Sequence, residues 1–336
     1  MESKIQYFTA PAVTASEAPL PPLTISYKTV GNPSSPAILI PTCFGGKIEE
    51  SLTFLWRQTG TEPPVLSNYY VVICGLLGGS ESSSPSNAEQ SIRGSKFPKV
   101  TYKDNIDLQY KLCRSLGIRS LVAYIGFSMG GQQAYHMGIL YPDFAHRIIA
   151  LATSARTSMH NKAIQTALRA SIINSVDWCG GEYKTPCRQG TVAFGKVFTG
   201  WAFSTEWFDA EGWKALGFNT IEALFEDDEK NGLGSWDAHD LLCQLYTWEH
   251  GDISIHGPQP GNLKLALEQL KMPILLLPCR TDLFFPPAHS NSEVQYLARG
   301  TMTVLDSIWG HIAVGGFDLK PEEAFLQKQI SDFLKK

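Results

Sequence analysis

Short runs of apolar and β-branched residues recur along the chain, and each run is followed by turn residues. Their apolarity is continuous rather than alternating, which is typical of strands covered on both faces, as in parallel sheets of α/β proteins. The pattern predicts strands over residues 24–31, 37–42, 69–76, 121–127, 148–155, 274–279 and 302–307.

Helical periodicity fills much of the space between these runs. Residues 104–118 read as a helix with Asp104 as its N-cap and Gly117 as its stop, and residues 130–142 read as one that ends at Pro142. Residues 321–336 form an amphipathic pattern that closes the chain. Strands alternating with helices predict the α/β class, with a mostly parallel, doubly wound sheet.

Residues 159–267 break this alternation. The stretch is rich in aromatic residues and Gly, contains no clean strand pattern, and shows helical patterns at 166–173 and 238–248. We interpret it as a helical cap inserted between two halves of one core, residues 1–158 and 268–336. Most of its aromatic side chains are expected to pack between cap and core, with a minority lining a pocket.

Composition narrows the function. Of 336 residues, 43% are hydrophobic and 18% charged, and the net charge is −4, which leaves no basic footprint for nucleic acid or an anionic membrane. The longest apolar runs are too short to span a bilayer. Seven cysteines without a C-x-x-C spacing, and an N-terminus without a signal-like apolar segment, predict a cytoplasmic protein with reduced thiols. No metal-ligand, P-loop or dinucleotide motif occurs, so no cofactor is expected.

The stretch GFSMGG, residues 126–131, follows a predicted strand and opens a predicted helix. A G-x-S-x-G pattern alone is weak, but this setting is that of a nucleophile on a sharp strand-to-helix turn. The turn would present Ser128 at a helix N-terminus, where free N–H groups favour a developing anion. The alternative is a serine that merely caps a helix.

A serine nucleophile needs a histidine base and an acid that orients the base. His311 follows the last predicted strand, and Asp282 follows the strand after the cap, in the order Ser, Asp, His. Competing acids are Asp306 and Asp318, and the competing base is His289, for which a surface role is favoured. His136, His146 and His160 are interpreted as structural.

An oxyanion hole should combine two backbone N–H groups. One is expected from Met129, which follows the nucleophile. The other is expected from the Gly-rich loop PTCFGG, residues 41–46, where Cys43 and Phe44 are equal candidates. Cys43 would then lie near the chemistry through its backbone and not as a nucleophile.

Several longer stretches together resemble the homoserine O-acetyltransferase-like branch of the α/β-hydrolase superfamily. They include FPKVTYKDNIDLQYKLCRSLGI, GFSMGGQQAYHMGILYPDFAHRII, SARTSMHNKA, DWCGGEY, WDAHDLLCQLYTWEHGDIS and RTDLFFPP. The resemblance implies an α/β-hydrolase fold, a triad of Ser128, Asp282 and His311, and a homodimer formed through the cap.

The sequence also departs from that branch. The family's Asp after the catalytic His is Ile312 here, its cap Arg aligns with Lys196, and PTCFGG replaces its His-Ala-Leu-Thr-Gly pattern. Ile312 cannot pair with an ammonium group, so homoserine is not the expected acceptor. Lys196, Ile312 and Trp309 are predicted to contact substrate, although an exposed lysine without such a role is the simpler reading of Lys196.

The sequence therefore predicts a serine esterase or thioesterase acting on a small metabolite ester or thioester through an acyl-Ser128 intermediate. The first alternative is an O-acyltransferase that uses acetyl-CoA or another acyl-CoA and a hydroxyl acceptor other than homoserine. The second is a non-catalytic binding protein with the same fold.

Overall fold

The computed structural model describes residues 4–11, 21–58, 60–79, 81–315 and 319–336. Its centre is an eight-stranded sheet with the order β1-β2-β4-β3-β5-β6-β7-β8. Strands β4, β3, β5, β6, β7 and β8 run parallel, whereas β1 and β2 are antiparallel to their neighbours. The strands are β1 (Gln6–Ala10), β2 (Leu23–Val30), β3 (Ala37–Pro41), β4 (Tyr70–Cys74), β5 (Ala123–Phe127), β6 (Ile148–Leu151), β7 (Ile274–Leu277) and β8 (Gly300–Met302).

The predicted α/β class is confirmed, and an observed strand lies within or overlaps each of the predicted runs 24–31, 37–42, 69–76, 121–127, 148–155 and 274–279. The predicted strand over 302–307 is wrong beyond its first residue, because the chain pairs with β7 through residues 300–302 and afterwards keeps an isolated bridge from Leu305 to Cys279. β1 was not predicted, because its sequence QYFTA is short and mostly exposed. The helices are α1 (Tyr102–Ser115), α2 (Met129–Leu140), α3 (Met159–Ile173), α4 (Arg188–Ala202), α5 (Thr205–Asp209), α6 (Ile221–Asn231), α7 (Ala238–Glu249), α8 (Leu263–Gln269), α9 (Pro287–Val294) and α10 (Lys320–Leu334).

One predicted helix boundary is wrong. Asp104 is not the N-cap of α1; Thr101 is, and the two form a reciprocal capping box. The Thr101 side chain accepts a bond from the Asp104 N–H, while the Asp104 carboxylate accepts one from the Thr101 N–H. A Thr followed three residues later by an acidic residue provides acceptors for two backbone N–H groups at the start of the helix. Asp104 acting alone as the N-cap would not form this reciprocal pair.

Two apolar layers enclose the sheet. One face packs against α1, α2 and α8 around residues such as Tyr124 and Ile148, and the other packs against α10 and the segment 48–56 around residues such as Ile40 and Ile125. The strands β3 to β7 are buried on both faces, which explains their continuous apolarity.

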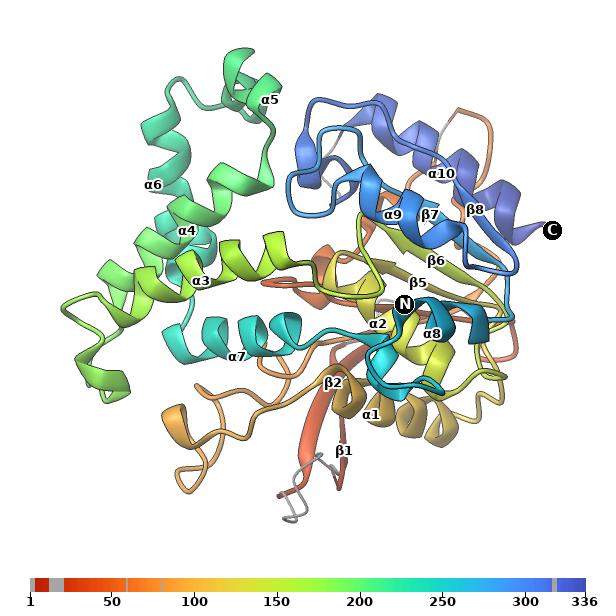
Figure 1. Cartoon of the computed structure of the whole chain (residues 1–336), viewed down its shortest axis with the longest axis horizontal. Coiled ribbons are helices and arrows are strands. Elements are labelled where there is room, and N and C mark those ends of the chain that lie inside the picture. Colours follow the sequence, from red (N-terminus) through yellow and green to blue (C-terminus); the bar gives the residue numbers. More distant parts are fainter. Residues whose placement is uncertain (1–3, 12–20, 59, 80, 316–318) are drawn as a thin grey trace.

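Helices α3 to α7 form a second body beside the core, coloured green to teal in Figure 1. This cap packs on the core through its own apolar cluster, which includes Phe44 and Met129 from the core and Phe194 and Trp248 from the cap. Farther along the predicted insertion, α8 packs with the core cluster through Ala266 and Leu267. The limits of 159 and 267 for the cap remain a prediction.

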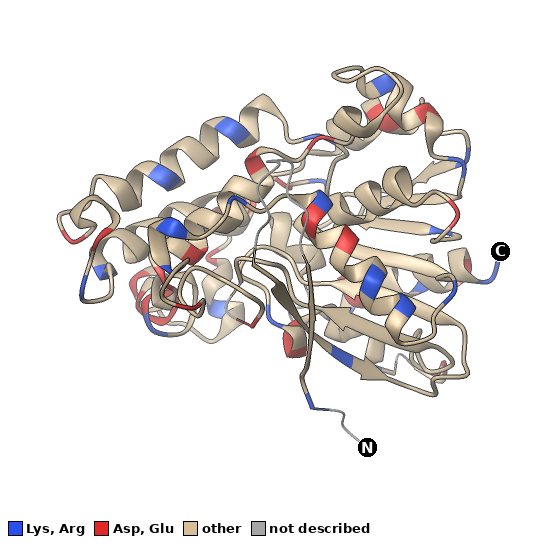
Figure 2. Cartoon of the chain, turned by 90° about the horizontal axis from the view of Figure 1, so that it is seen from below, with Lys and Arg blue, Asp and Glu red and all other residues tan. Residues whose placement is uncertain are grey.

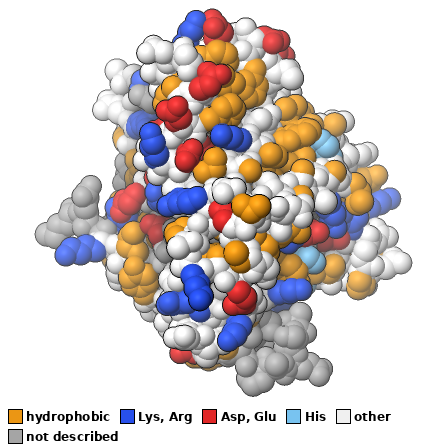
Figure 3. Space-filling model, turned by 90° about the vertical axis from the view of Figure 1, so that its left-hand side faces the viewer, with side chains coloured by type: hydrophobic (Ala, Val, Ile, Leu, Met, Phe, Trp, Pro, Cys, Tyr) orange, Lys and Arg blue, Asp and Glu red, His pale blue; other side chains and the backbone are white. Residues whose placement is uncertain are grey.

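Charged residues of both signs are interspersed over core and cap in the view of Figure 2. The face of the cap shown in Figure 3 likewise mixes acidic, basic and apolar side chains. Among the residues that the structure describes, none of the helices combines the length and apolarity that a membrane span requires.

A buried carboxyl group lies behind the nucleophile helix. Glu293 of α9 accepts hydrogen bonds from the Tyr135 hydroxyl of α2 at 3.0 Å and from the Ala155 N–H at 2.8 Å. Burial raises the pKa of Glu293 to about 7, although both hydrogen bonds and nearby Arg156 act in the opposite direction. The group therefore joins α2, α9 and the segment after β6.

This pKa predicts a pH-dependent stability. Because the folded pKa is above the ordinary value of 4.5, the contribution of Glu293 is fully present below that value and is lost as the pH rises through about 7. The loss in the free energy of unfolding is at most about 3 kcal/mol. In Glu293→Gln this part of the pH dependence should vanish, as measured by urea unfolding at pH 5 and pH 8. An unchanged pH slope would contradict it.

Candidate active site

Ser128 lies on a strained turn between β5 and α2. Its backbone has φ 57° and ψ −123°, a conformation that L-residues rarely adopt and that costs about 1–3 kcal/mol. The surroundings hold it there: the Ser128 N–H donates to the Leu151 carbonyl at 2.9 Å, and the Thr153 hydroxyl donates to the Ser128 carbonyl at 2.7 Å. The turn therefore presents the side chain at the start of α2.

Two glycines around Ser128 are required by close backbone packing. A Cβ atom at Gly126 would lie 2.0 Å from the Gly130 carbonyl oxygen, and one at Gly131 would lie 2.3 Å from the Thr153 Cγ2 atom. Any side chain at either position would force the turn open. The G-x-S-x-G-G pattern is thus a steric consequence of how tightly β5, α2 and β6 meet.

His311 and Asp282 complete a hydrogen-bonded relay with Ser128. The His311 Nε2 atom lies 2.9 Å from Ser128 Oγ, and His311 Nδ1 lies 2.8 Å from Asp282 Oδ2. The Asp282 Oδ1 atom accepts bonds from the backbone N–H groups of Phe284 and Phe285, at 2.8 and 2.9 Å. Three donors therefore hold the Asp282 carboxylate in place. Asp282 is also only 2% exposed, which shields the carboxylate from water.

Aromatic rings hold the imidazole of His311 in this orientation. Phe127 stacks on it with a centroid distance of 4.7 Å and an angle of 30° between the planes, Phe284 meets it edge-on at 5.2 Å, and Phe285 lies at 5.5 Å. His311 is 4% exposed. The packing leaves the ring little freedom to rotate away from Ser128 and Asp282.

The competing acids and bases lie elsewhere. Asp306 is exposed and pairs with Arg280, which also forms a two-pronged ion pair with Glu206 of the cap. Asp318 lies outside the described residues. His289 is half-buried on α9, and burial followed by nearby His160 lowers its pKa.

The remaining histidines downstream of the turn have no bond to the relay. His136 is buried inside α2 with its Nδ1 at 2.8 Å from the Gln132 carbonyl, and burial lowers its pKa to about 4. His146 and His160 are exposed.

The loop that follows β3 faces the start of α2. Among the described residues, neither the N–H of Cys43 nor that of Phe44 has a hydrogen-bond acceptor, so both remain candidates for the second oxyanion donor beside Met129. Desolvation raises the pKa of the Cys43 thiol to about 12, which keeps it protonated at neutral pH.

Sequence reasoning missed the residues that fix this loop. Gln133 of α2 donates to the Thr42 carbonyl at 3.1 Å, and Gln244 of the cap helix α7 accepts from the Gly45 N–H at 2.9 Å. The contact could not be predicted from local sequence, because Gln244 and Gly45 are 199 positions apart and no local pattern indicates which group a helical glutamine will bind.

A chamber of about 180 Å³ opens above Ser128 and His311, and we call it the nucleophile chamber. Ile312 lines it, and a contact of Ile312 with substrate remains a prediction. Lys196 is exposed on α4 and is not part of its lining. Trp309 also lies outside the lining and packs against Phe203 and Trp207 of the cap, with centroid distances of 6.3 and 5.8 Å.

Comparison with known proteins agrees with this geometry. Residues 36–183 match the family model described as the alpha/beta hydrolase fold. An ethyl acetate hydrolase of Pseudomonas veronii is 31% identical over 289 residues, which cover 84% of this chain and 81% of that protein. This chain belongs to the α/β-hydrolase family.

Two further α/β hydrolases are similar over most of their length. The crystal structure of the acetyl esterase MekB superposes with a TM-score of 0.92 at 27% identity, covering 100% of this chain and 98% of that one. A homoserine O-acetyltransferase of Carboxydothermus hydrogenoformans is 28% identical over 308 residues, covering 82% and 80% of the two chains. The predicted resemblance is confirmed, and the chain is a serine-dependent acyl hydrolase or O-acyltransferase of this family.

Within the described part of the chain, no group of three or more His, Cys, Asp or Glu side chains is arranged to hold a metal ion.

Proposed function

We propose that this enzyme is an esterase that hydrolyses small esters of a short acid through a covalent acyl-Ser128 intermediate. The observation that carries the proposal is the relay from Ser128 Oγ through His311 to Asp282, built on a strained turn inside a chamber of about 180 Å³. Similarity to an ethyl acetate hydrolase and to an acetyl esterase supports acetate esters as the first substrates to assay.

The first half-reaction follows from the distances in the relay. His311 Nε2, 2.9 Å from Ser128 Oγ, takes the hydroxyl proton as the oxygen attacks the ester carbonyl. Asp282 holds Nδ1 in its protonated tautomer and stabilises the imidazolium that forms. The N–H of Met129 and that of Phe44 or Cys43 would hold the oxyanion. The carbon–alkoxy bond then breaks, and the alkoxy oxygen takes the proton from His311.

The second half-reaction restores the enzyme. Water loses a proton to His311 as it attacks the acyl-Ser128 carbonyl, the acid leaves, and Ser128 Oγ recovers its proton. The net change is ester plus water to acid plus alcohol. A thioester such as an acyl-CoA could enter the same sequence with a thiol as the leaving group.

An O-acyltransferase is the second candidate function, because a homoserine O-acetyltransferase aligns with 82% of this chain at 28% identity. In that case a hydroxyl compound replaces water in the second half-reaction, and acetyl-CoA is the donor. The apolar side chain of Ile312 disfavours homoserine as the acceptor, since it cannot pair with an ammonium group. Hydrolysis is the outcome that we propose.

Measuring the amounts of free acid and of new ester that are formed distinguishes a hydrolase from an O-acyltransferase. We expect that incubation with ethyl acetate or acetyl-CoA together with a panel of alcohols and homoserine yields mainly free acetate. Ser128→Ala, which lacks the nucleophile, is the control for uncatalysed hydrolysis. Predominant formation of a new ester with any acceptor would reject hydrolysis in favour of transfer.

We further propose that the enzyme acts in the cytoplasm, needs no cofactor, and forms a homodimer through its cap. All seven cysteines are free, which supports a reducing compartment. The dimer rests only on the resemblance to homoserine O-acetyltransferases, and size-exclusion chromatography with light scattering would test it.

A further inference from the structure

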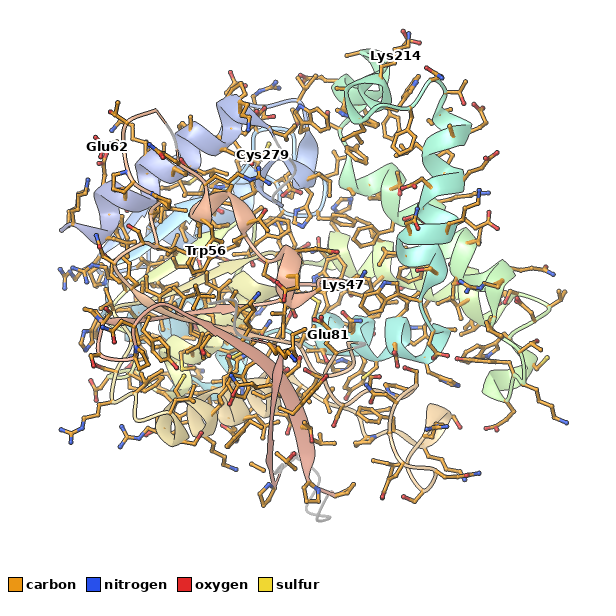
Figure 4. All side chains as sticks on the ribbon, turned by 180° about the vertical axis from the view of Figure 1, so that it is seen from behind. Lys47, Trp56, Glu62, Glu81, Lys214 and Cys279 are labelled. Atoms are coloured by element: carbon orange, nitrogen blue, oxygen red, sulfur yellow. The ribbon has the colours of Figure 1, made fainter. Side chains whose placement is uncertain are left out.

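A second, larger chamber adjoins the nucleophile chamber on the cap side. It measures about 580 Å³, against about 180 Å³ for the nucleophile chamber, and we call it the cap chamber. The two share part of their lining, so they lie next to each other. The shared residues are Phe44, Gly45, Lys47, Glu50, Phe198 and Ile312. Lys47, labelled in Figure 4, lies where the core meets the cap helices.

Much of the wall of the cap chamber is apolar. The apolar side chains come from α4 and the residue after it, from α6 and from the segment between α5 and α6, and include Phe203, Leu216, Phe218 and Leu224. Such walls favour an apolar ligand, because burying a charged or hydrogen-bonding group against them would leave it without a partner.

The charged groups that line the cap chamber each have a partner within the protein. Lys47 lies 3.7 Å from Glu50, and Asp227 accepts a bond of 2.7 Å from Asn231. Asp228 accepts a bond of 3.2 Å from the Leu233 N–H. Each charged group thus has a partner in the absence of a ligand, and the apolar walls are the part of the lining left to select one.

The position of His311 decides which part of an ester enters which chamber. In the proposed reaction the alkoxy oxygen must lie near His311 Nε2 in order to take its proton. Ile312, the next residue, lines both chambers, whereas Ser128 and His311 line only the smaller one. The alcohol part would therefore extend along Ile312 toward the cap chamber. The acyl part is left with the confined space among Cys43, Leu52 and Phe127.

We propose that the cap chamber is the alcohol subsite, and that the preferred substrates are esters of a short acid with a larger apolar alcohol. The proposal rests on the esterase function above and adds the substrate class. As the carbon–alkoxy bond breaks, the alkoxy oxygen takes the proton from His311, and the neutral alcohol departs through the cap chamber. Water then releases the acid from Ser128.

Two ester series on the unmodified enzyme test the proposal. In the first, acetate is fixed and the alcohol grows from ethyl to butyl, hexyl and 2-phenylethyl; in the second, ethanol is fixed and the acid grows from acetyl to butyryl and hexanoyl. We expect kcat/KM to rise by roughly threefold per added methylene in the first series until the chamber is filled. It should fall in the second series.

A substitution that fills the cap chamber provides a second test, and a substitution elsewhere on the same helix provides its matched control. Leu224→Trp adds bulk to the wall on α6, whereas Glu226→Trp places the same side chain on the exposed side of that helix, outside the lining. The ratio of kcat/KM for hexyl acetate to that for ethyl acetate should fall about tenfold in Leu224→Trp. It should not change in Glu226→Trp.

Each outcome is decisive. A rise with acid length and a fall with alcohol length would reverse the assignment of the chambers, and equal rates in both series would also overturn it. These results would leave the esterase function standing. Absence of hydrolysis for every ester by a folded protein would instead overturn the esterase function and this proposal with it. The two ester series remain informative if Leu224→Trp does not fold.

Discussion

Ser128→Ala is expected to lower kcat/KM for ethyl acetate by at least about 10⁴-fold. The substitution removes the only atom that the relay can activate, Ser128 Oγ at 2.9 Å from His311 Nε2. The neighbouring thiol of Cys43 cannot substitute, because its pKa of about 12 keeps it protonated. Initial rates with wild-type and variant protein at equal concentration measure the effect.

The fold should survive the substitution of Ser128. The backbone bonds that hold the turn, from Ser128 N–H to Leu151 and from Thr153 to the Ser128 carbonyl, do not involve the removed hydroxyl. Ser171→Ala, in which the altered side chain bonds only to its own helix, is the matched control and should retain full activity. Substantial hydrolysis by Ser128→Ala would assign the chemistry to another residue.

Asp282→Asn is expected to lower kcat by about 10⁴-fold with the fold retained. The amide oxygen of Asn can still accept from the N–H groups of Phe284 and Phe285. Its NH₂ would then face His311 Nδ1 and donate to it, which puts the proton of the neutral ring on Nε2. In that tautomer Nε2 cannot take the Ser128 proton.

Asp306→Asn is the matched control for the acid. Asp306 is exposed and binds Arg280, so its loss removes one of the ion pairs between this loop and its surroundings and nothing from the relay. Activity should change by less than about threefold, in line with the small worth of exposed ion pairs. If Asp306→Asn inactivates the enzyme and Asp282→Asn does not, the assignment of the acid is wrong.

Much of this architecture could be predicted from local sequence. The strands β3 to β7 are buried on both faces and therefore read as unbroken apolar runs, and the turn at Ser128 needs glycines at fixed offsets. The order Ser, Asp, His could be predicted because each residue follows a strand whose carboxyl end lies at the same edge of a parallel sheet.

What could not be predicted depends on contacts between distant segments. Gln244 meets Gly45 only because the cap folds back on the core, and Trp309 packs against cap residues for the same reason. The cap chamber has walls from α4, α6 and the loop after β3, and no local pattern encodes their meeting. The N-cap of α1, by contrast, has a local signal in the sequence, because Thr101 is followed three residues later by the acidic Asp104, the spacing of a capping box.

The central claim is that Ser128 is the acylated nucleophile, and covalent labelling tests it most directly. The native protein would be treated with a fluorophosphonate, which traps activated serines irreversibly, and the modified peptide would be located by mass spectrometry. We expect one label, on Ser128, that disappears in Ser128→Ala and is formed far more slowly in Asp282→Asn. A label on any other residue, or no label on folded and ester-hydrolysing protein, would contradict it.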